Sequence, residues 1–223
     1  MRRTLALAAI PAVALALSAC SDETPENPTG VTQSEGAAVE CPPEEGAAEP
    51  VQSFNAAPPM CIDPEKTYTA VLETDAGEVT IALDAAKAPK TVNNFVVLSR
   101  YGFYEGVTFH RVIPTFMIQG GDPTGQGNGG PGYQFEDELP KAGEYEVGSI
   151  AMANAGPDTN GSQFFIVTGD AGVDLPPKYS LFGKVTEGMD VVTEIEQDGT
   201  DSGVPETTHT IEKVTITEVT TAD

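Results

Sequence analysis

The chain has 223 residues, of which 39% are hydrophobic, 34 are acidic and 11 are basic. This composition is typical of a folded protein with one core, and the length allows a single domain. The formal charge of −23 makes nucleic acids and anionic lipid headgroups unfavourable partners.

The first residues predict an export signal rather than part of the core. Arg2 and Arg3 precede an apolar run over residues 5–17, which is shorter than the roughly 20 residues that a bilayer-spanning helix needs. The sequence Leu-Ser-Ala-Cys at residues 17–20 resembles the lipobox of bacterial lipoproteins. We expect residues 1–19 to be a lipoprotein signal peptide and Cys20 to carry a lipid that anchors the protein to the extracytoplasmic face of the cell membrane. The alternative is an ordinary signal peptide in which Cys20 is incidental.

Residues 20–65 predict a flexible tether that begins at the lipidated cysteine. Residues 21–65 are rich in Pro, Glu, Ala and Ser, contain ten acidic and no basic residues, and show no helical or strand periodicity. Export would place Cys41 and Cys61 in an oxidising compartment, where they are candidates for a disulfide. Two free thiols are the alternative, and the spacing does not decide between them.

Regular structure is predicted from residue 68 onward. Residues 68–74 and 79–83 alternate in the manner of a β-hairpin. Apolar residues at helical spacing predict one helix behind Thr91, as a candidate N-cap, and a second over residues 189–195. Further short strands are predicted at residues 107–113, 116–119, 149–153, 163–167, 179–185 and 209–219. Short strands at such spacing indicate a barrel or a sandwich.

Two apparent ligand motifs carry no site. Residues 125–130 satisfy G-x-G-x-x-G, but Pro131 and Gly132 follow in place of a helix, which excludes a dinucleotide site. His110 and His209 lack metal-ligand spacing to each other or to a cysteine pair. We therefore expect no metal and no cofactor.

Three segments carry a family resemblance. FHRVIPTFMIQGGD at residues 109–122 and MANAGPDTNGSQFFI at residues 152–166 resemble the two signatures of cyclophilins, and residues 179–185 match a third block. The resemblance implies that residues 66–222 form a mainly β domain, a closed eight-stranded antiparallel barrel capped by two helices. It also implies a shallow peptide groove on the outer face of the barrel.

The resemblance implies a function as well. Cyclophilins are peptidyl-prolyl cis/trans isomerases, so this chain is expected to accelerate proline-limited folding of exported proteins without a covalent intermediate. The implied partners are proline-containing segments of unfolded or exported proteins and, through the lipid, a bilayer. We expect a monomer.

Residue matching to the family implies the site. The implied catalytic residues are Arg111, Gln119 and Asn154. The implied substrate-binding residues are Phe116, Met117, Ala153, Gln163, Phe165, Leu175 and Tyr179. Without the resemblance, Arg111 would be assigned to a surface salt bridge and the aromatic residues to the core, where Phe109 and Phe164 are expected in either case.

The sequence departs from the family at the rim of the groove. Asp174 stands where many cyclophilins have tryptophan, and Tyr179 stands where histidine is usual. These departures motivate an alternative function, a peptide-binding chaperone or interaction module that uses the same groove with little turnover.

Overall fold

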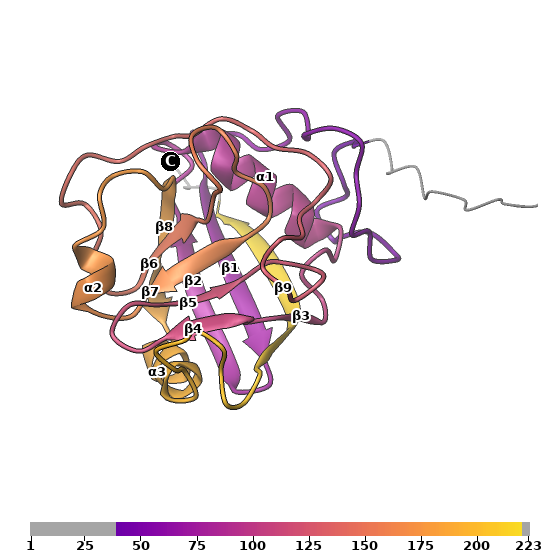
Figure 1. Cartoon of the computed structure of the whole chain (residues 1–223). Helices are drawn as coiled ribbons and strands as arrows, with labels where there is room; N and C mark the ends of the chain where they lie inside the picture. Colours follow the sequence, from indigo (N-terminus) through magenta and orange to yellow (C-terminus); the bar gives the residue numbers. More distant parts are fainter. Residues whose placement is uncertain (1–38, 220–223) are drawn as a thin grey trace, which may run out of the picture. The chain divides into compact units, whose positions relative to one another are not determined.

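The structure is a computed structural model that describes residues 39–219, all of which lie in one compact unit. Nine strands form a single antiparallel sheet that curls around a hydrophobic core (Figure 1). The strands are β1 (Thr67–Thr74), β2 (Gly77–Leu83), β3 (Val107–Thr108), β4 (Arg111–Ile113), β5 (Met117–Gly120), β6 (Ser149–Met152), β7 (Phe164–Val167), β8 (Leu181–Glu187) and β9 (Thr210–Val219). The helices are α1 (Pro89–Arg100), α2 (Asp170–Val173) and α3 (Met189–Gln197). The predicted signal peptide and Cys20 lie outside the described residues.

The mainly β, antiparallel fold is confirmed, but a curled sheet of nine strands stands in place of the expected closed eight-stranded barrel. The strand order is β3-β9-β1-β2-β8-β6-β7-β5-β4, and an isolated bridge between Thr108 and Asp122 links the two end regions of this curled sheet. The extra strand arises because residues 107–113 divide: β3 pairs with β9, whereas β4 pairs with β5. A third helix, α2, is also present, and its four residues are too few to show a helical period.

Alternation along β1 and β2 creates the core. Tyr68, Ala70 and Leu72 are fully buried on one strand, and Ile81 is fully buried on the other. Side chains at alternate positions of a strand point to the same face, so this face closes over the interior. The ring of Phe95, from α1, fills the centre and contacts the rings of Tyr104, Phe164 and Phe182. Helices α1 and α3 lie at opposite ends of the sheet (Figure 1).

Helix α1 begins earlier than predicted, and Thr91 is not its N-cap. The helix begins at Pro89, whose fixed φ suits the first turn. The N–H and the hydroxyl of Thr91 each donate to a carboxylate oxygen of Glu138 at 2.8 Å, and the N–H of Lys90 donates to the other oxygen at 3.1 Å. A carboxylate distant in the sequence thus satisfies N–H groups that a local cap would normally serve.

The prediction of a flexible tether is wrong for residues 39–65, which pack along α1 and the loop that follows it. Phe54 is only 2% exposed, and the N–H groups of Ala47 and Val51 donate to the carbonyls of Arg100 and Tyr101 at 2.7 and 2.9 Å. A few apolar and main-chain contacts therefore order a segment whose composition resembles a linker. We call residues 41–61 the disulfide strap.

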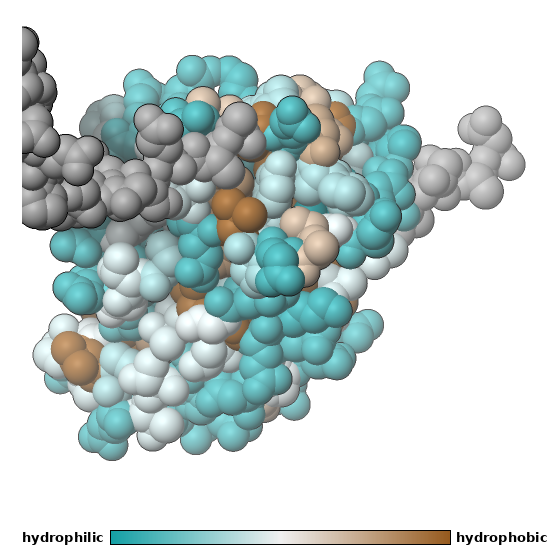
Figure 2. Space-filling model, turned by 90° about the vertical axis from the view of Figure 1, so that its right-hand side faces the viewer, coloured by the Kyte–Doolittle hydropathy of each residue, from teal (hydrophilic) through white to brown (hydrophobic). Residues whose placement is uncertain are grey.

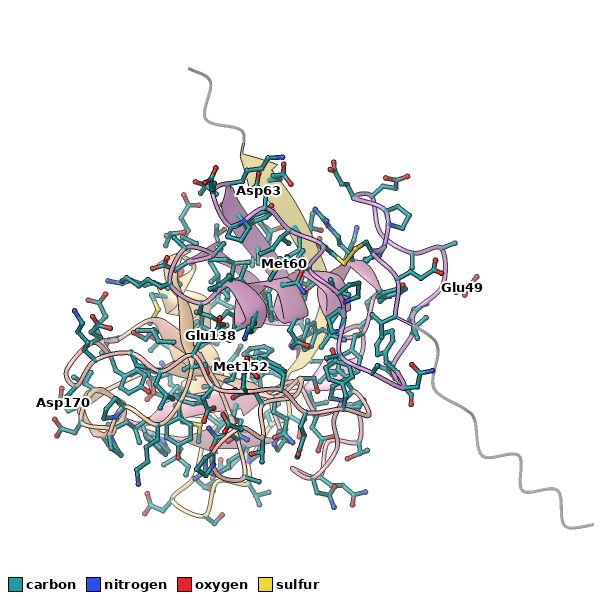
Figure 3. All side chains as sticks on the ribbon, turned by 90° about the horizontal axis from the view of Figure 1, so that it is seen from above. Glu49, Met60, Asp63, Glu138, Met152 and Asp170 are labelled. Carbon is teal, nitrogen blue, oxygen red and sulfur yellow. A yellow bond between two sulfur atoms is a disulfide. The ribbon has the colours of Figure 1, made fainter. Side chains whose placement is uncertain are left out.

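Cys41 and Cys61 are joined in a disulfide that closes the strap. Figure 3 shows this bond beside α1 and near Met60, with Glu49 at the outer turn of the strap. The side of the molecule that carries the strap is largely hydrophilic, with small separate hydrophobic spots (Figure 2). Among the helices within residues 39–219, none has the length and apolar character that crossing a membrane requires.

Candidate functional site

A second hydrophobic cluster lies on the outer face of the sheet. Ile118 and Phe164 belong to the core, and the residues beside them in sequence, Met117 and Phe165, belong to the outer cluster. Phe109 is likewise in the core, as expected. The outer cluster has a buried floor of Met117, Tyr145, Ala151, Phe165 and Val167, and its partly exposed members include Ile113, Phe116, Ala153, Leu175 and Tyr179. We call this cluster the apolar patch.

Tyr179 stands on the apolar patch in a fixed position. Its ring meets the ring of Phe165 edge-on, with the centroids 5.4 Å apart. The hydroxyl of Tyr145 donates to the carbonyl of Tyr179 at 2.7 Å and accepts from the N–H of Tyr179 at 3.1 Å. A firm apolar floor with aromatic edges suits a proline ring.

Arg111 borders the apolar patch from the edge strand β4. It lies opposite Gln119 of β5, and its guanidinium donates to the side-chain oxygen of Gln119 at 3.1 Å. The guanidinium carbon lies 5.7 Å from the centroid of the Phe116 ring, within the range of a cation–π contact. Within residues 39–219 no carboxylate forms a salt bridge with Arg111, so the salt-bridge assignment finds no support there.

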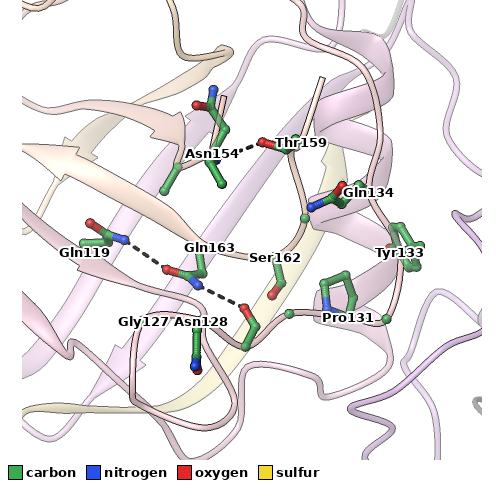
Figure 4. A pocket seen from close by; sticks show the side chains of 16 residues that line it. Gln119, Gly127, Asn128, Pro131, Tyr133, Gln134, Asn154, Thr159, Ser162 and Gln163 are labelled. Carbon is green, nitrogen blue, oxygen red and sulfur yellow. Dashed lines mark hydrogen bonds between the residues drawn. The ribbon is translucent and has the colours of Figure 1, made fainter. Parts of the chain in front are cut away.

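A chain of hydrogen bonds holds Gln119 (Figure 4). The amide nitrogen of Gln119 donates to the side-chain oxygen of Gln163 at 2.9 Å, and the amide nitrogen of Gln163 donates to the carbonyl of Gly129 at 2.9 Å. Because each amide donates in one direction and accepts in the other, the oxygen of Gln119 is turned toward Arg111. The relay therefore connects the guanidinium to the glycine-rich loop.

Asp122 organises that loop. Its buried carboxylate accepts hydrogen bonds from the hydroxyl of Thr124 and from four main-chain N–H groups, those of Thr124, Gln126, Gly127 and Gly129. Burial raises the pKa of Asp122, but the bonds from Gly129, Thr124 and Gly127 outweigh it and lower the pKa to about 2. A Cβ at Gly129 would lie 2.0 Å from the carboxylate, so this position requires glycine. The G-x-G-x-x-G run thus wraps a side chain of the protein itself.

A pocket of about 640 Å³ adjoins the apolar patch. It is lined by the loop of residues 127–134, by residues 153–155, by Thr159, by residues 161–163 and by Gln119 (Figure 4). The side chain of Asn154 donates to the carbonyl of Lys178 at 2.9 Å. Within the described part of the chain, the main-chain N–H and C=O of Asn154 make no hydrogen bond, so both are available to a bound peptide.

The predicted groove residues come together on this outer face. Gln119, Ala153, Asn154 and Gln163 line the pocket. Phe116, Met117, Phe165, Leu175 and Tyr179 form the apolar patch. Within residues 39–219 no three His, Cys, Asp or Glu side chains gather as a metal site.

Sequence reasoning missed two residues that shape the site. Asp122 precedes a run of glycines, and an Asp that starts such a loop often accepts N–H bonds from it, which is a usable signal. Tyr145 lies in a loop without periodicity, so no local signal places it under Tyr179.

Comparison with known proteins gives concordant matches. Residues 69–221 match the family model described as cyclophilin type peptidyl-prolyl cis-trans isomerase/CLD. The chain is similar to peptidyl-prolyl cis-trans isomerase-like 1 of Mus musculus, with 48% identity over 144 residues that cover 63% of this chain and 84% of the relative. It is also similar to peptidyl-prolyl cis-trans isomerase A of Mycobacterium tuberculosis, with 45% identity over 172 residues that cover 69% of this chain and 94% of the relative.

Solved structures agree with the sequence matches. The fold is similar to a cyclophilin type peptidyl-prolyl cis-trans isomerase of Cryptosporidium parvum, with a TM-score of 0.63 and 35% identity over 68% of this chain and 98% of the other. A second crystal structure of that protein, in the presence of the dipeptide Ala-Pro, matches with a TM-score of 0.62 and 36% identity over 67% of this chain and 98% of the other.

Proposed function

The chain belongs to the cyclophilin-type peptidyl-prolyl cis-trans isomerases, and from this premise we propose that the outer groove catalyses the reaction with Arg111 as its central residue. The observation that carries the assignment is the guanidinium of Arg111. It lies beside an apolar patch, is held by Gln119, and is not neutralised by a carboxylate of residues 39–219.

The chemistry follows from amide resonance. Rotation about an X-Pro bond crosses a barrier of about 18–20 kcal/mol because twisting breaks the partial double bond. The prolyl nitrogen regains its lone pair in the twisted state, and the guanidinium of Arg111 can then donate a hydrogen bond to it. This bond is strong only in the transition state, so it raises kcat.

The remaining residues hold the peptide while one side of the bond rotates. The apolar patch would receive the proline ring against Phe116, Met117, Phe165 and Leu175. The free main-chain groups of Asn154 and the amide of Gln119 would hold the adjoining residues. Because the sheet supports these groups, little ordering is needed when the peptide binds.

The central test is proline cis/trans exchange measured by NMR. The chain should start at residue 21, which keeps the disulfide strap, and should be compared with Arg111→Ala. Loss of one preorganised donor predicts a fall in kcat/KM of about 10²- to 10³-fold, with peptide binding retained. If the intact protein binds the peptide without accelerating exchange, the alternative of a peptide-binding module is correct; Asp174 and Tyr179 at the rim motivate that alternative.

We propose in addition that the enzyme acts as a lipid-anchored monomer on the extracytoplasmic face of the cell membrane, where its clients are exported proteins. The lipobox at residues 17–20 supports this, and so does the disulfide between Cys41 and Cys61, since such bonds persist in oxidising compartments. Cys20→Ser should release the protein from the membrane fraction, and unchanged membrane association would refute the anchor. Sedimentation of the released protein tests the monomer.

A further inference from the structure

The disulfide strap touches one wall of the pocket although it lies outside the family match at residues 69–221. The N–H of Phe54 donates to the carbonyl of Pro131 at 2.7 Å. Gly132 has φ +99°, and a Cβ there would lie 2.2 Å from the carbonyl oxygen of Phe54. The two backbones therefore approach more closely than any residue other than glycine permits.

The ring of Phe54 fixes the next residue of that wall. The ring is buried, and its centroid lies 5.1 Å from that of Tyr101 and 6.5 Å from that of Tyr133. The hydroxyl of Tyr133 donates to the side-chain oxygen of Asn94 at 2.6 Å. Tyr133 is thus held by the strap on one side and by α1 on the other. Pro131, Gly132 and Tyr133 all line the pocket, and Figure 4 shows Pro131 and Tyr133 at the same side of it.

The ends of the strap are fastened independently of Phe54. The disulfide joins Cys41 to Cys61. The N–H of Cys61 donates to the side-chain oxygen of Asn93 at 2.7 Å, and the amide nitrogen of Asn93 donates to the carbonyl of Pro59 at 2.8 Å. Closing the loop covalently restricts where Phe54 can go, because the disulfide ties the Cys41 end to Cys61, which is bonded to α1.

We propose that the disulfide strap determines substrate specificity, with Phe54 as the positioning residue for the pocket wall at residues 131–133. The inference rests on the proposed isomerisation at the groove. The pocket adjoins the apolar patch at Ala153, so a peptide whose proline ring occupies the patch and whose neighbouring residues bond the main chain of Asn154 would place the side chains before the X-Pro pair in the pocket. Its lining within residues 39–219 is uncharged and consists of amide and hydroxyl side chains together with glycines, alanines, a proline and a tyrosine, so it suits large neutral side chains such as glutamine.

The test compares two peptides. They differ only in carrying glutamine or glycine at the two positions that precede the X-Pro pair, and NMR exchange gives kcat and KM for each. Phe54→Ala should raise KM for the glutamine peptide about fivefold and leave kcat and the glycine peptide unchanged, because the wall contacts only a large side chain. The double variant Cys41→Ser, Cys61→Ser should also raise KM for the glutamine peptide, but by less than Phe54→Ala does.

Ile62→Ala provides the control for a general loss of stability. Ile62 is also buried, follows the strap directly, and packs in the core. The Ile62→Ala variant should have a lower melting temperature and an unchanged ratio of the KM values for the two peptides. Phe54→Leu, which keeps most of the apolar volume, serves if Phe54→Ala does not fold.

The outcomes separate this inference from the proposed function. An unchanged KM ratio in Phe54→Ala, or in Phe54→Leu where Phe54→Ala does not fold, overturns the role of the strap, and so does an equal change in Ile62→Ala. If the intact protein shows no turnover, the proposed function fails, and NMR titration with the same two peptides still measures whether Phe54 controls their affinity ratio.

Discussion

Gly203 lies against the stem of Arg111 and allows a sharp test of how the guanidinium is held. The loop that contains Gly203 pairs with the edge of β4: the N–H of Val112 donates to the carbonyl of Gly203 at 2.9 Å, and the N–H of Thr200 donates to the carbonyl of Val112 at 3.1 Å. Gly203 has φ +85°, and a Cβ there would lie 3.1 Å from Cγ of Arg111 and 3.5 Å from Cγ1 of Ile113. Gly203→Ala should therefore push the arginine stem away from the loop.

The magnitude follows from the contact distance. An ordinary Cβ contact is 3.4–4 Å, so the stem must move by a few tenths of an ångström from 3.1 Å. Misplacement of a catalytic group by 1 Å can cost about 10²-fold in rate, which predicts a fall of roughly fivefold in kcat for Gly203→Ala. The positive φ should also cost about 1–2 kcal/mol in the free energy of unfolding. NMR exchange and urea denaturation measure the two effects separately.

Gly143 provides the matched control. Its φ is +82°, and a Cβ there would meet nothing within 4 Å. Gly143→Ala should lose similar stability with full activity. In the Arg111→Ala background, Gly203→Ala should add no further loss of activity, since its effect passes through Arg111. Equal activity losses in the two glycine variants, or a persistent effect in that background, would refute the reasoning.

Three further predictions concern the supports of the groove. The folded pKa of Asp122 is about 2, below its ordinary 3.8, so the ionised carboxylate stabilises the folded state by about 2 kcal/mol. This stabilisation is complete above pH 4 and is lost as the pH falls toward 2. Urea denaturation of Asp122→Asn should lack this part of the pH dependence. Tyr145→Phe removes both hydrogen bonds to the main chain of Tyr179. KM should therefore rise about twofold to fivefold, and the free energy of unfolding should fall by about 1 kcal/mol. An unchanged KM would show that Tyr179 needs no support. Glu138→Ala leaves the first N–H groups of α1 without their carboxylate and should cost about 1 kcal/mol of stability at unchanged kcat; thermal unfolding that matches the wild type would contradict this.

Local patterns were enough for much of the fold, whereas the centre of the site was predicted only through the family resemblance. Arg111 and Gln119 face each other because β4 and β5 are joined by a short turn, so their pairing depends on only nine consecutive residues. Strand alternation likewise separates Phe164, which faces the core, from Phe165, which faces the groove. The β1–β2 hairpin follows from the same period.

Contacts between distant segments decided the rest. Residues 107–113 read as one strand, yet two different partners divide them, and the carboxylate of Glu138 replaces Thr91 as the support for the start of α1. The strap has the composition of a solvated linker, yet it packs against the domain. It does so because burial of Phe54 and the disulfide matter more to its order than average hydrophobicity does. Composition and periodicity describe neighbours in the chain, whereas Phe54 meets Pro131 and Tyr145 meets Tyr179 only once the sheet has curled and its loops have packed.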